Sequence, residues 1–241
     1  MKKLSEIKAL CRDYFFVARQ FLHFAVLKGK LPEFLKLSSR IIKSKDNSFF
    51  SKLKCGVLFF NSQNYPHNHQ FFSLIINKYL KNHPGKISNI LDLGCGFGDF
   101  AYFLDKSLDV QYTGIDFSQD IAPVWEIVSS QTNSRFYKND VRGFVKKPMC
   151  FDLITCLNTI MYFEDYPSFL EDIFKNSKKS AEFIVSFSTP AKPPLSIHKH
   201  GPVRITKELF EREASRIGFK IEDYFEFPLS DGIISTYLMK K

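Results

Sequence analysis

Hydrophobic residues fall into two kinds of segment from Lys86 to the end of the chain. Short apolar runs of the length of buried strands occur at Asn89–Leu93, Val110–Ile115, Arg135–Lys138, Phe151–Cys156 and Phe183–Phe187. Helical stretches lie between them, near Asp99–Asp105, Asp120–Ser130, Tyr166–Ser177 and Thr206–Ile217. Strands that alternate with helices in this way predict a parallel sheet covered on both faces.

The last two apolar runs have a different connection. Lys220–Phe227 and Ile233–Met239 are separated only by the stretch PLSDG, a turn that suits an antiparallel hairpin. The expected fold class is therefore α/β, with a seven-stranded, mostly parallel sheet, helices on both faces and a C-terminal antiparallel hairpin.

An N-terminal helical extension precedes this pattern. Apolar residues recur every three or four positions from Leu4 to Leu27, which predicts an amphipathic helix with a wide apolar face. A shorter helical piece follows at Glu33–Lys43, and a further helix, Asn68–Leu80, should end at the stretch NHPG. We expect residues 1–55 to form the extension and residues 56–241 to form the main domain.

The positive charge of the chain is concentrated in this extension. Residues 1–55 hold 13 Lys and Arg against 4 Asp and Glu, whereas the rest of the chain is balanced at 21 against 21. Three interpretations follow: a helical cap or dimerisation element packed on the main domain, an interfacial helix contacting a membrane through residues 1–30, or an arm that binds a polyanion such as RNA. The charge of the whole chain thus says little about the main domain.

Composition limits the remaining classes. The chain has 241 residues, of which 44% are hydrophobic and 24% charged, as in ordinary globular proteins. Its five cysteines are scattered and show no zinc-ligand spacing, so we expect no metal and a reducing compartment, the cytoplasm. The stretch Tyr14–Leu27 is too short and too polar to span a bilayer.

The first strand-like run leads directly into three glycines, Gly94, Gly96 and Gly98, in the stretch NILDLGCGFGDF. Glycine lets a backbone approach a ligand closely, and ligands of α/β sheets lie outside the carboxyl ends of the strands. The spacing differs from the dinucleotide fingerprint. Because Asp92 and Asp99 bracket the loop with negative charge, a ligand with local positive charge fits better than a phosphate.

These residues resemble a known family. ILDLGCGFGDF is similar to the first motif of the class I, Rossmann-like S-adenosylmethionine-dependent methyltransferases. YTGIDFS, FYKNDVRGF, FDLITCLNTIMYFED and ASRIGFKIEDY resemble its later landmarks, in the same order, so that the resemblance covers residues 68–241. It implies the cofactor S-adenosylmethionine, which carries an ammonium group and a sulfonium but no phosphate.

The resemblance also implies roles for single residues. Asp92 would orient the loop and interact with the ammonium group, and Asp116 would hold the ribose hydroxyls. Phe117 packs either beside the adenine or in the core, and Asp140 either contacts adenine or serves as a turn residue. The full set of expected cofactor contacts is Asp92, Gly94, Cys95, Gly96, Gly98, Asp116, Phe117, Asp140, Val141 and Leu157.

Methyl transfer is an in-line displacement, so the protein must hold the acceptor in line and exclude water, and a hydroxyl acceptor also benefits from a base. Expected catalytic residues are His198, His200 and Tyr162, and expected substrate-binding residues are His67, His69 and Arg204. In the stretch HKHGPVR, two histidines and two basic side chains suit an anionic substrate group. For each histidine on its own, the alternative is an exposed loop residue.

The sequence therefore predicts an S-adenosylmethionine-dependent methyltransferase that acts on an oxygen or nitrogen of a small molecule or small conjugate, one that carries an anionic group if the HKHGPVR hypothesis holds. Nucleic-acid bases are disfavoured because LNTI does not resemble the motif of adenine methylation. Two alternatives stay open: a membrane-surface lipid or quinone methyltransferase or an RNA methyltransferase that uses the basic extension, and a non-catalytic binding protein of the same fold. The sequence does not fix the oligomeric state.

Overall fold

A seven-stranded sheet forms the centre of the protein. The computed structural model describes residues 66–81, 86–104, 108–118, 121–190, 203–229 and 232–241. The strands are β1 (Asn89–Leu93), β2 (Gln111–Asp116), β3 (Ser134–Lys138), β4 (Leu153–Leu157), β5 (Glu182–Pro190), β6 (Lys220–Leu229) and β7 (Gly232–Lys240). Their order is β3-β2-β1-β4-β5-β7-β6, in which β7 runs opposite to the other six strands. The expected fold class and its C-terminal hairpin are confirmed.

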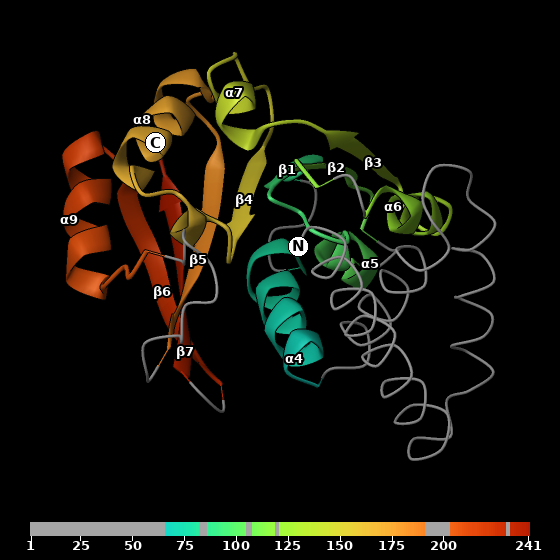
Figure 1. The fold of residues 1–241 in the computed structure, drawn as a ribbon, viewed down its shortest axis with the longest axis horizontal. Helices are drawn as coiled ribbons and strands as arrows, with labels where there is room; N and C mark the ends of the chain where they lie inside the picture. The colour runs from blue at the N-terminus through green and yellow to red at the C-terminus, as the bar shows by residue number, and fades with distance from the viewer. Residues whose placement is uncertain (1–65, 82–85, 105–107, 119–120, 191–202, 230–231) are drawn as a thin grey trace, which may run out of the picture.

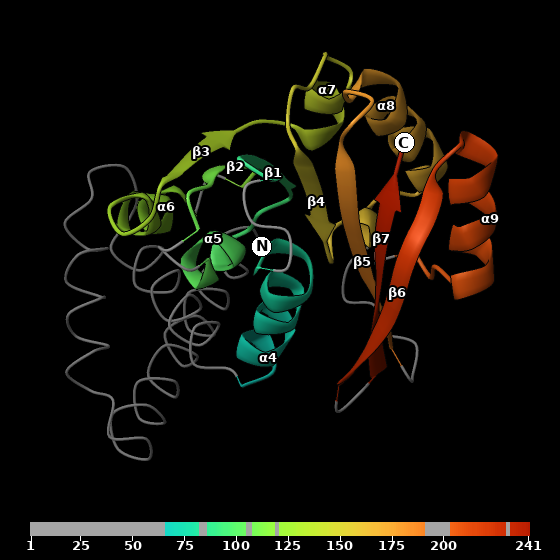
Figure 2. The same cartoon turned by 180° about the vertical axis from the view of Figure 1, so that it is seen from behind.

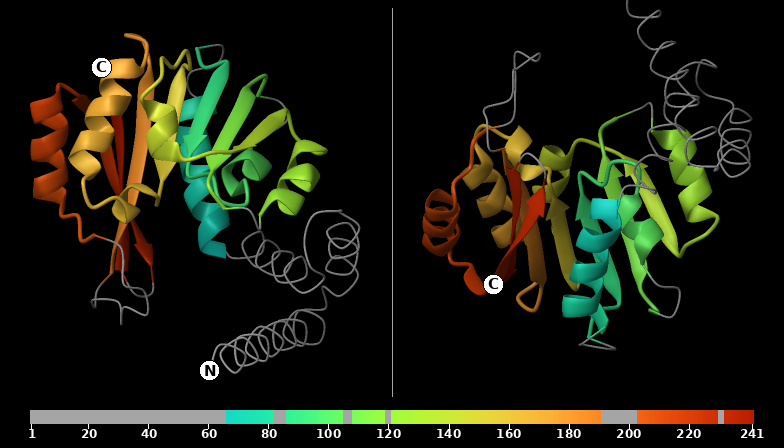
Figure 3. Two further views of the ribbon diagram at one scale, coloured as in Figure 1. Left: turned by 45° about the horizontal axis from the view of Figure 1, so that its top comes forward. Right: turned by 90° about the horizontal axis from the view of Figure 1, so that it is seen from below.

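Helices cover both faces of this sheet (Figures 1 and 2). One face carries α4 (Pro66–Ile75), α5 (Asp99–Phe103) and α6 (Ala122–Ser129), and the other carries α7 (Val141–Val145), α8 (Tyr166–Asn176) and α9 (Lys207–Ile217) (Figure 3). The core is correspondingly split into two clusters. Residues such as Ile90 and Tyr112 point to the first face, whereas Leu91 and Ile115 point to the second, as the two-residue period of a strand requires.

The ends of the helices have local causes. The side chain of Thr206 accepts a hydrogen bond from Leu209 N and so caps α9, which stops at Gly218 in a left-handed conformation. Asp140 caps α7 in the same way by accepting from Arg142 N and Gly143 N. The short α7 was not expected from the sequence, since five residues are too few to show a helical repeat.

The helix expected at Asn68–Leu80 consists of two parts. After α4 the chain continues as a π-helix, η2 (Ile76–Lys81). This end is fastened to strand β6, because Lys78 pairs with Asp223 at 2.6 Å and the Tyr79 hydroxyl donates to the same carboxylate at 3.1 Å. α4 and η2 thus belong to the main domain.

The other predicted bounds of the described elements agree with the structure to within three residues, as is usual for the ends of helices and strands. The segments expected as helices at 4–27 and 33–43 lie outside the described residues. Among the described helices, none is long and apolar enough to cross a membrane.

Candidate active site

The strand order reverses between β1 and β4, and their carboxyl ends point to the same edge of the sheet. Such a reversal point is where α/β folds bind ligands. The glycine loop follows β1 at this edge and is fastened to the neighbouring strand, because Gly94 N and Cys95 N both donate to Ile115 O, at 2.8 and 3.1 Å. The loop therefore lies across the ends of β1 and β2.

All three glycines of the loop have positive φ angles: 76° at Gly94, 52° at Gly96 and 82° at Gly98. A Cβ atom on Gly94 would lie 2.2 Å from the Thr159 side chain, and one on Gly98 would lie 2.7 Å from the ring of Phe136. A Cβ atom on Gly96 would meet nothing within 4 Å. The outer two glycines are thus packed against the protein, whereas Gly96 faces open space that a ligand can fill.

Asp116 stands at the end of β2 beside this loop. Its Oδ2 accepts from Gly96 N at 3.0 Å, and its Oδ1 accepts from Ser118 N at 2.9 Å. Each carboxylate oxygen can accept a further hydrogen bond, so both can still receive a ribose hydroxyl. The next side chain, Phe117, is 75% exposed. Of the two alternatives for Phe117, packing in the core does not occur; its contact with adenine stays a prediction.

Asp92 lies beneath the loop and is 3% exposed. Tyr112 donates to its Oδ2 at 2.5 Å and Thr155 donates to its Oδ1 at 2.7 Å. Burial raises the pKa of Asp92 to about 6, although these two hydrogen bonds lower it. Contact with the ammonium group stays a prediction, and the structure adds that two buried hydroxyls orient this carboxylate.

A pH dependence of stability follows from Asp92. Because its pKa in the folded state exceeds the ordinary value of 3.8, the group stabilises the fold fully below pH ~4, and this contribution is lost as the pH rises through about 6. From pH 5 to pH 7.5 we expect the free energy of unfolding to fall by ~1.4 kcal/mol through this group, which is about half of the whole effect of the raised pKa. Denaturant titrations of the wild type and of Asp92→Asn test it, since the variant lacks this titration. An equal pH dependence in both proteins would contradict the assignment.

Asn158 follows β4 at the same edge and was not singled out by the sequence. Among the described residues it is the one non-glycine residue with a positive φ, 54°. Its backbone N donates to both the carbonyl and the hydroxyl of Ser186, at 3.0 Å, while its buried Oδ1 finds no donor among the residues that the structure describes. Because the next residue, Thr159, packs on Gly94, this unpartnered acceptor lies at the glycine-loop edge, where it suits a cofactor that carries an ammonium group.

The neighbouring Thr159 connects this segment to the glycine loop. Its hydroxyl donates to Gly94 O at 3.1 Å. Trp125, on α6, reaches the same loop from the other side, where its Nε1 donates to Gly96 O at 2.8 Å. Both contacts join residues far apart in the sequence, so no local pattern could have indicated them.

The remaining residues expected to contact the cofactor lie at three places: the start of α7, the end of β4 and the glycine loop. The Asp140 side chain is engaged at the start of α7, and Val141 is buried in the core cluster under that helix. Leu157 is partly buried at the end of β4. Cys95 is buried within the loop, and burial raises the pKa of its thiol. Their contacts with a cofactor stay predictions.

The expected catalytic and substrate-binding residues divide into three groups. Tyr162, 64% exposed, lies on a short 3-10 helix, η3 (Ile160–Tyr162). The backbone before exposed Arg204 is attached to this helix, because Val203 N donates to Met161 O at 2.6 Å. His67 packs edge-on against Phe227 near the carboxyl end of β6, and His69 against Phe103. His198 and His200 lie outside the described residues.

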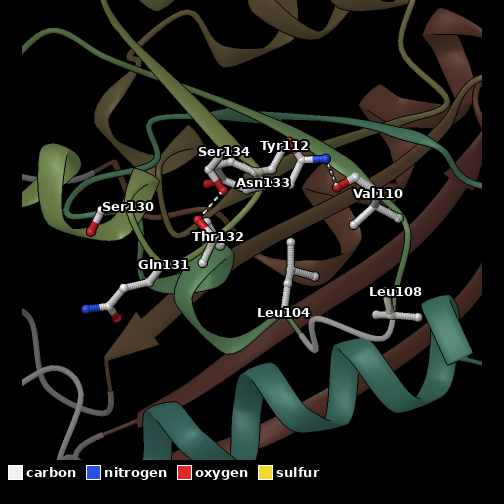
Figure 4. Close-up of a pocket in the computed structure, with 10 residues that line it drawn as sticks. Leu104, Leu108, Val110, Tyr112, Ser130, Gln131, Thr132, Asn133 and Ser134 are labelled. Atoms are coloured by element: carbon white, nitrogen blue, oxygen red, sulfur yellow. Dashed lines mark hydrogen bonds between the residues drawn. The ribbon is translucent and has the colours of Figure 1, made fainter.

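A separate hollow of about 380 Å³ lies at the opposite edge of the sheet (Figure 4). It is formed by the amino-terminal ends of β2 and β3 and the ends of α5 and α6, with Leu104 and Leu108 on one side and Thr132 and Ser134 on the other. It is therefore distinct from the glycine-loop edge. The described part of the chain holds no group of three or more residues suited to a metal ion.

Comparisons with known proteins agree with this geometry. Residues 85–215 match the family model described as "Methyltransferase domain". A relative, phosphoethanolamine N-methyltransferase of Triticum aestivum, is 26% identical over 114 residues, which are 46% of this chain and 22% of the relative. The chain thus matches about a fifth of that relative's length.

Solved structures show the same fold. Magnesium protoporphyrin IX methyltransferase from Synechocystis PCC 6803, with S-adenosylhomocysteine bound, superposes with a TM-score of 0.60 at 12% identity and covers 92% of this chain and 97% of that one. An S-adenosylmethionine-dependent methyltransferase from Clostridium acetobutylicum gives 0.57 at 16% identity, covering 76% and 96%. The chain therefore belongs to the methyltransferase-domain family, as a member of the S-adenosylmethionine-dependent class with the class I, Rossmann-like fold.

Proposed function

We propose that the protein transfers a methyl group from S-adenosylmethionine to an oxygen or nitrogen of a small molecule that carries an anionic group. The observation that supports the anionic group is the position of Arg204, an exposed residue whose neighbour Val203 is hydrogen-bonded to Met161, the residue before Tyr162, at the edge that carries the glycine loop. An arginine there offers several N–H donors to a phosphate or carboxylate.

The cofactor supplies an already activated methyl group, so the chain's own residues bind and position. Gly96 gives the open backbone surface that the cofactor would approach, and Asp116 offers carboxylate oxygens to the ribose hydroxyls. Asn158 Oδ1 and the charge of Asp92 favour the ammonium group. Together these contacts would hold the methyl group toward the open side of the edge.

The acceptor side is formed by Tyr162 and Arg204. Tyr162 carries a hydroxyl that can accept or donate a hydrogen bond to an approaching amine or alcohol. Arg204 would bind the anionic group at the far end of the same molecule. The acceptor atom would then be held in line with the methyl group, and this orientation raises the rate of transfer. The Triticum aestivum relative is named for phosphoethanolamine, an amine with a phosphate, which is consistent with this class of acceptor.

The proposal is tested by methyl transfer to matched acceptor pairs with and without the anionic group, such as phosphoethanolamine and ethanolamine. Within a pair that is turned over, we expect the anionic member to have the lower KM. Arg204→Ala should raise that KM by about tenfold or more, the effect of losing a charged hydrogen bond, without changing S-adenosylmethionine binding. Arg204→Lys keeps the charge and should recover part of the loss.

Two results would count against it. Equal KM values for charged and neutral acceptors would remove the anionic group from the proposal. Binding of S-adenosylmethionine without methyl transfer to any of a broad set of amines, alcohols and their phosphate esters would favour the alternative, a binding protein of this fold.

A further inference from the structure

We propose that Trp125 is a positioning residue for cofactor binding, because it holds the backbone of Gly96, which in turn holds the Asp116 carboxylate toward the ribose hydroxyls. The inference rests on the role proposed above for Asp116. The polar contact of Trp125 is with the backbone of Gly96, so its influence on the carboxylate would pass through the loop.

The contacts form a continuous chain. Trp125 Nε1 donates to Gly96 O at 2.8 Å, and Gly96 N donates to Asp116 Oδ2 at 3.0 Å. Gly96 is the one glycine of the loop whose Cβ position is open, so side-chain packing does not restrain it directly. Its two backbone hydrogen bonds therefore take over the restraint that packing gives to Gly94 and Gly98.

The indole is held in one orientation. Trp125 is 6% exposed and stacks on Phe136, with ring centroids 5.5 Å apart and an interplanar angle of 11°. The Phe136 ring fills the space that Gly98 and Gly114 leave free, where a Cβ atom would lie 2.7 and 2.6 Å from it. An indole has a single hydrogen-bond donor, so this packing aims that donor at one acceptor.

This arrangement distinguishes positioning from general packing. If Trp125 acts through Asp116, removing its N–H group should loosen the carboxylate, and the loss should vanish once the carboxylate is gone. If it only stabilises the fold, the loss should be the same with or without Asp116. A double-mutant cycle measures this difference.

The experiment uses the full chain and S-adenosylhomocysteine, with affinity measured by calorimetry. Trp125→Phe keeps an aromatic ring on Phe136 and deletes the donor, and we expect it to weaken binding about fivefold. In the Asp116→Ala background, the same substitution should change affinity less than twofold. Phe169→Leu, a buried change on the other face of the sheet, is the control for destabilisation and should bind like the wild type.

The outcomes separate the two claims. If Asp116→Ala alone binds like the wild type, the proposed ribose contact fails, and this inference with it. If Asp116→Ala weakens binding but Trp125→Phe has no effect, or an equal effect in both backgrounds, only the inference fails. Because Trp125 is the single tryptophan of the chain, indole fluorescence gives a second readout. The buried indole should be shielded from an added quencher even without ligand, and strong quenching in the ligand-free chain would contradict the fixed orientation on which the inference rests.

Discussion

Replacing Asp116 by alanine is expected to weaken binding of S-adenosylhomocysteine by about 100-fold. Two charge-assisted hydrogen bonds to ribose hydroxyls would be lost, which together account for ~3 kcal/mol. The carboxylate also accepts from Gly96 N and Ser118 N, so part of the loss would arise from a looser loop. Calorimetry and a competition assay against labelled cofactor measure the affinity.

Asp152 supplies a matched control. Its carboxylate also accepts two backbone N–H groups, from Ser88 at 2.8 Å and Asn89 at 2.9 Å, but it stands at the amino-terminal edge of the sheet. Asp152→Ala should cost stability and leave the affinity for S-adenosylhomocysteine unchanged. An equal loss of affinity in both variants would show that Asp116 acts through stability alone.

The second large effect is expected at the glycine loop, where Gly98→Ala should lower the free energy of unfolding by ~3 kcal/mol. The left-handed backbone at φ 82° accounts for ~1–2 kcal/mol, and overlap of the new methyl group with the Phe136 ring accounts for the rest. For a domain of this size the midpoint of thermal unfolding should fall by about 10 °C.

Gly96→Ala is the variant to compare with Gly98→Ala, because it should affect cofactor affinity rather than stability. Its φ of 52° costs ~1 kcal/mol, and the new methyl group meets no protein atom. The fold should therefore be nearly as stable as the wild type, while the affinity for S-adenosylhomocysteine falls by about tenfold because the methyl group occupies the open side of the loop. Thermal unfolding and calorimetry of the two variants separate the effects. Similar loss of stability in both would contradict the distinction between packed and open glycines.

Most of the fold could be predicted from the sequence because its signals are local. The run Asn89–Leu93 matched strand β1, and the turn stretch before Ile233 correctly indicated the antiparallel hairpin. The short helix α7 was missed because it has too few residues for a helical repeat and because its start signal, the Asp140 cap, marks a turn as readily as a helix start.

The site could be predicted only in part, for a similar reason. The glycines and Asp116 lie in local motifs, and the structure brings them together at one edge. Asn158, Thr159 and Trp125 act through contacts with residues far away in the sequence, which no spacing reveals. For Asp92 the sequence indicated the residue but not its surroundings. Its motif is local, whereas its hydrogen bonds with Tyr112 and Thr155 join distant parts of the chain.

The central claim is that the glycine-loop edge binds the cofactor of a class I methyltransferase. Calorimetric titration of the full chain with S-adenosylhomocysteine, at two temperatures so that a vanishing enthalpy cannot hide binding, tests this most directly. We predict saturable binding with one molecule per chain and a raised midpoint of thermal unfolding in its presence. No heat at either temperature and no thermal shift would contradict the account.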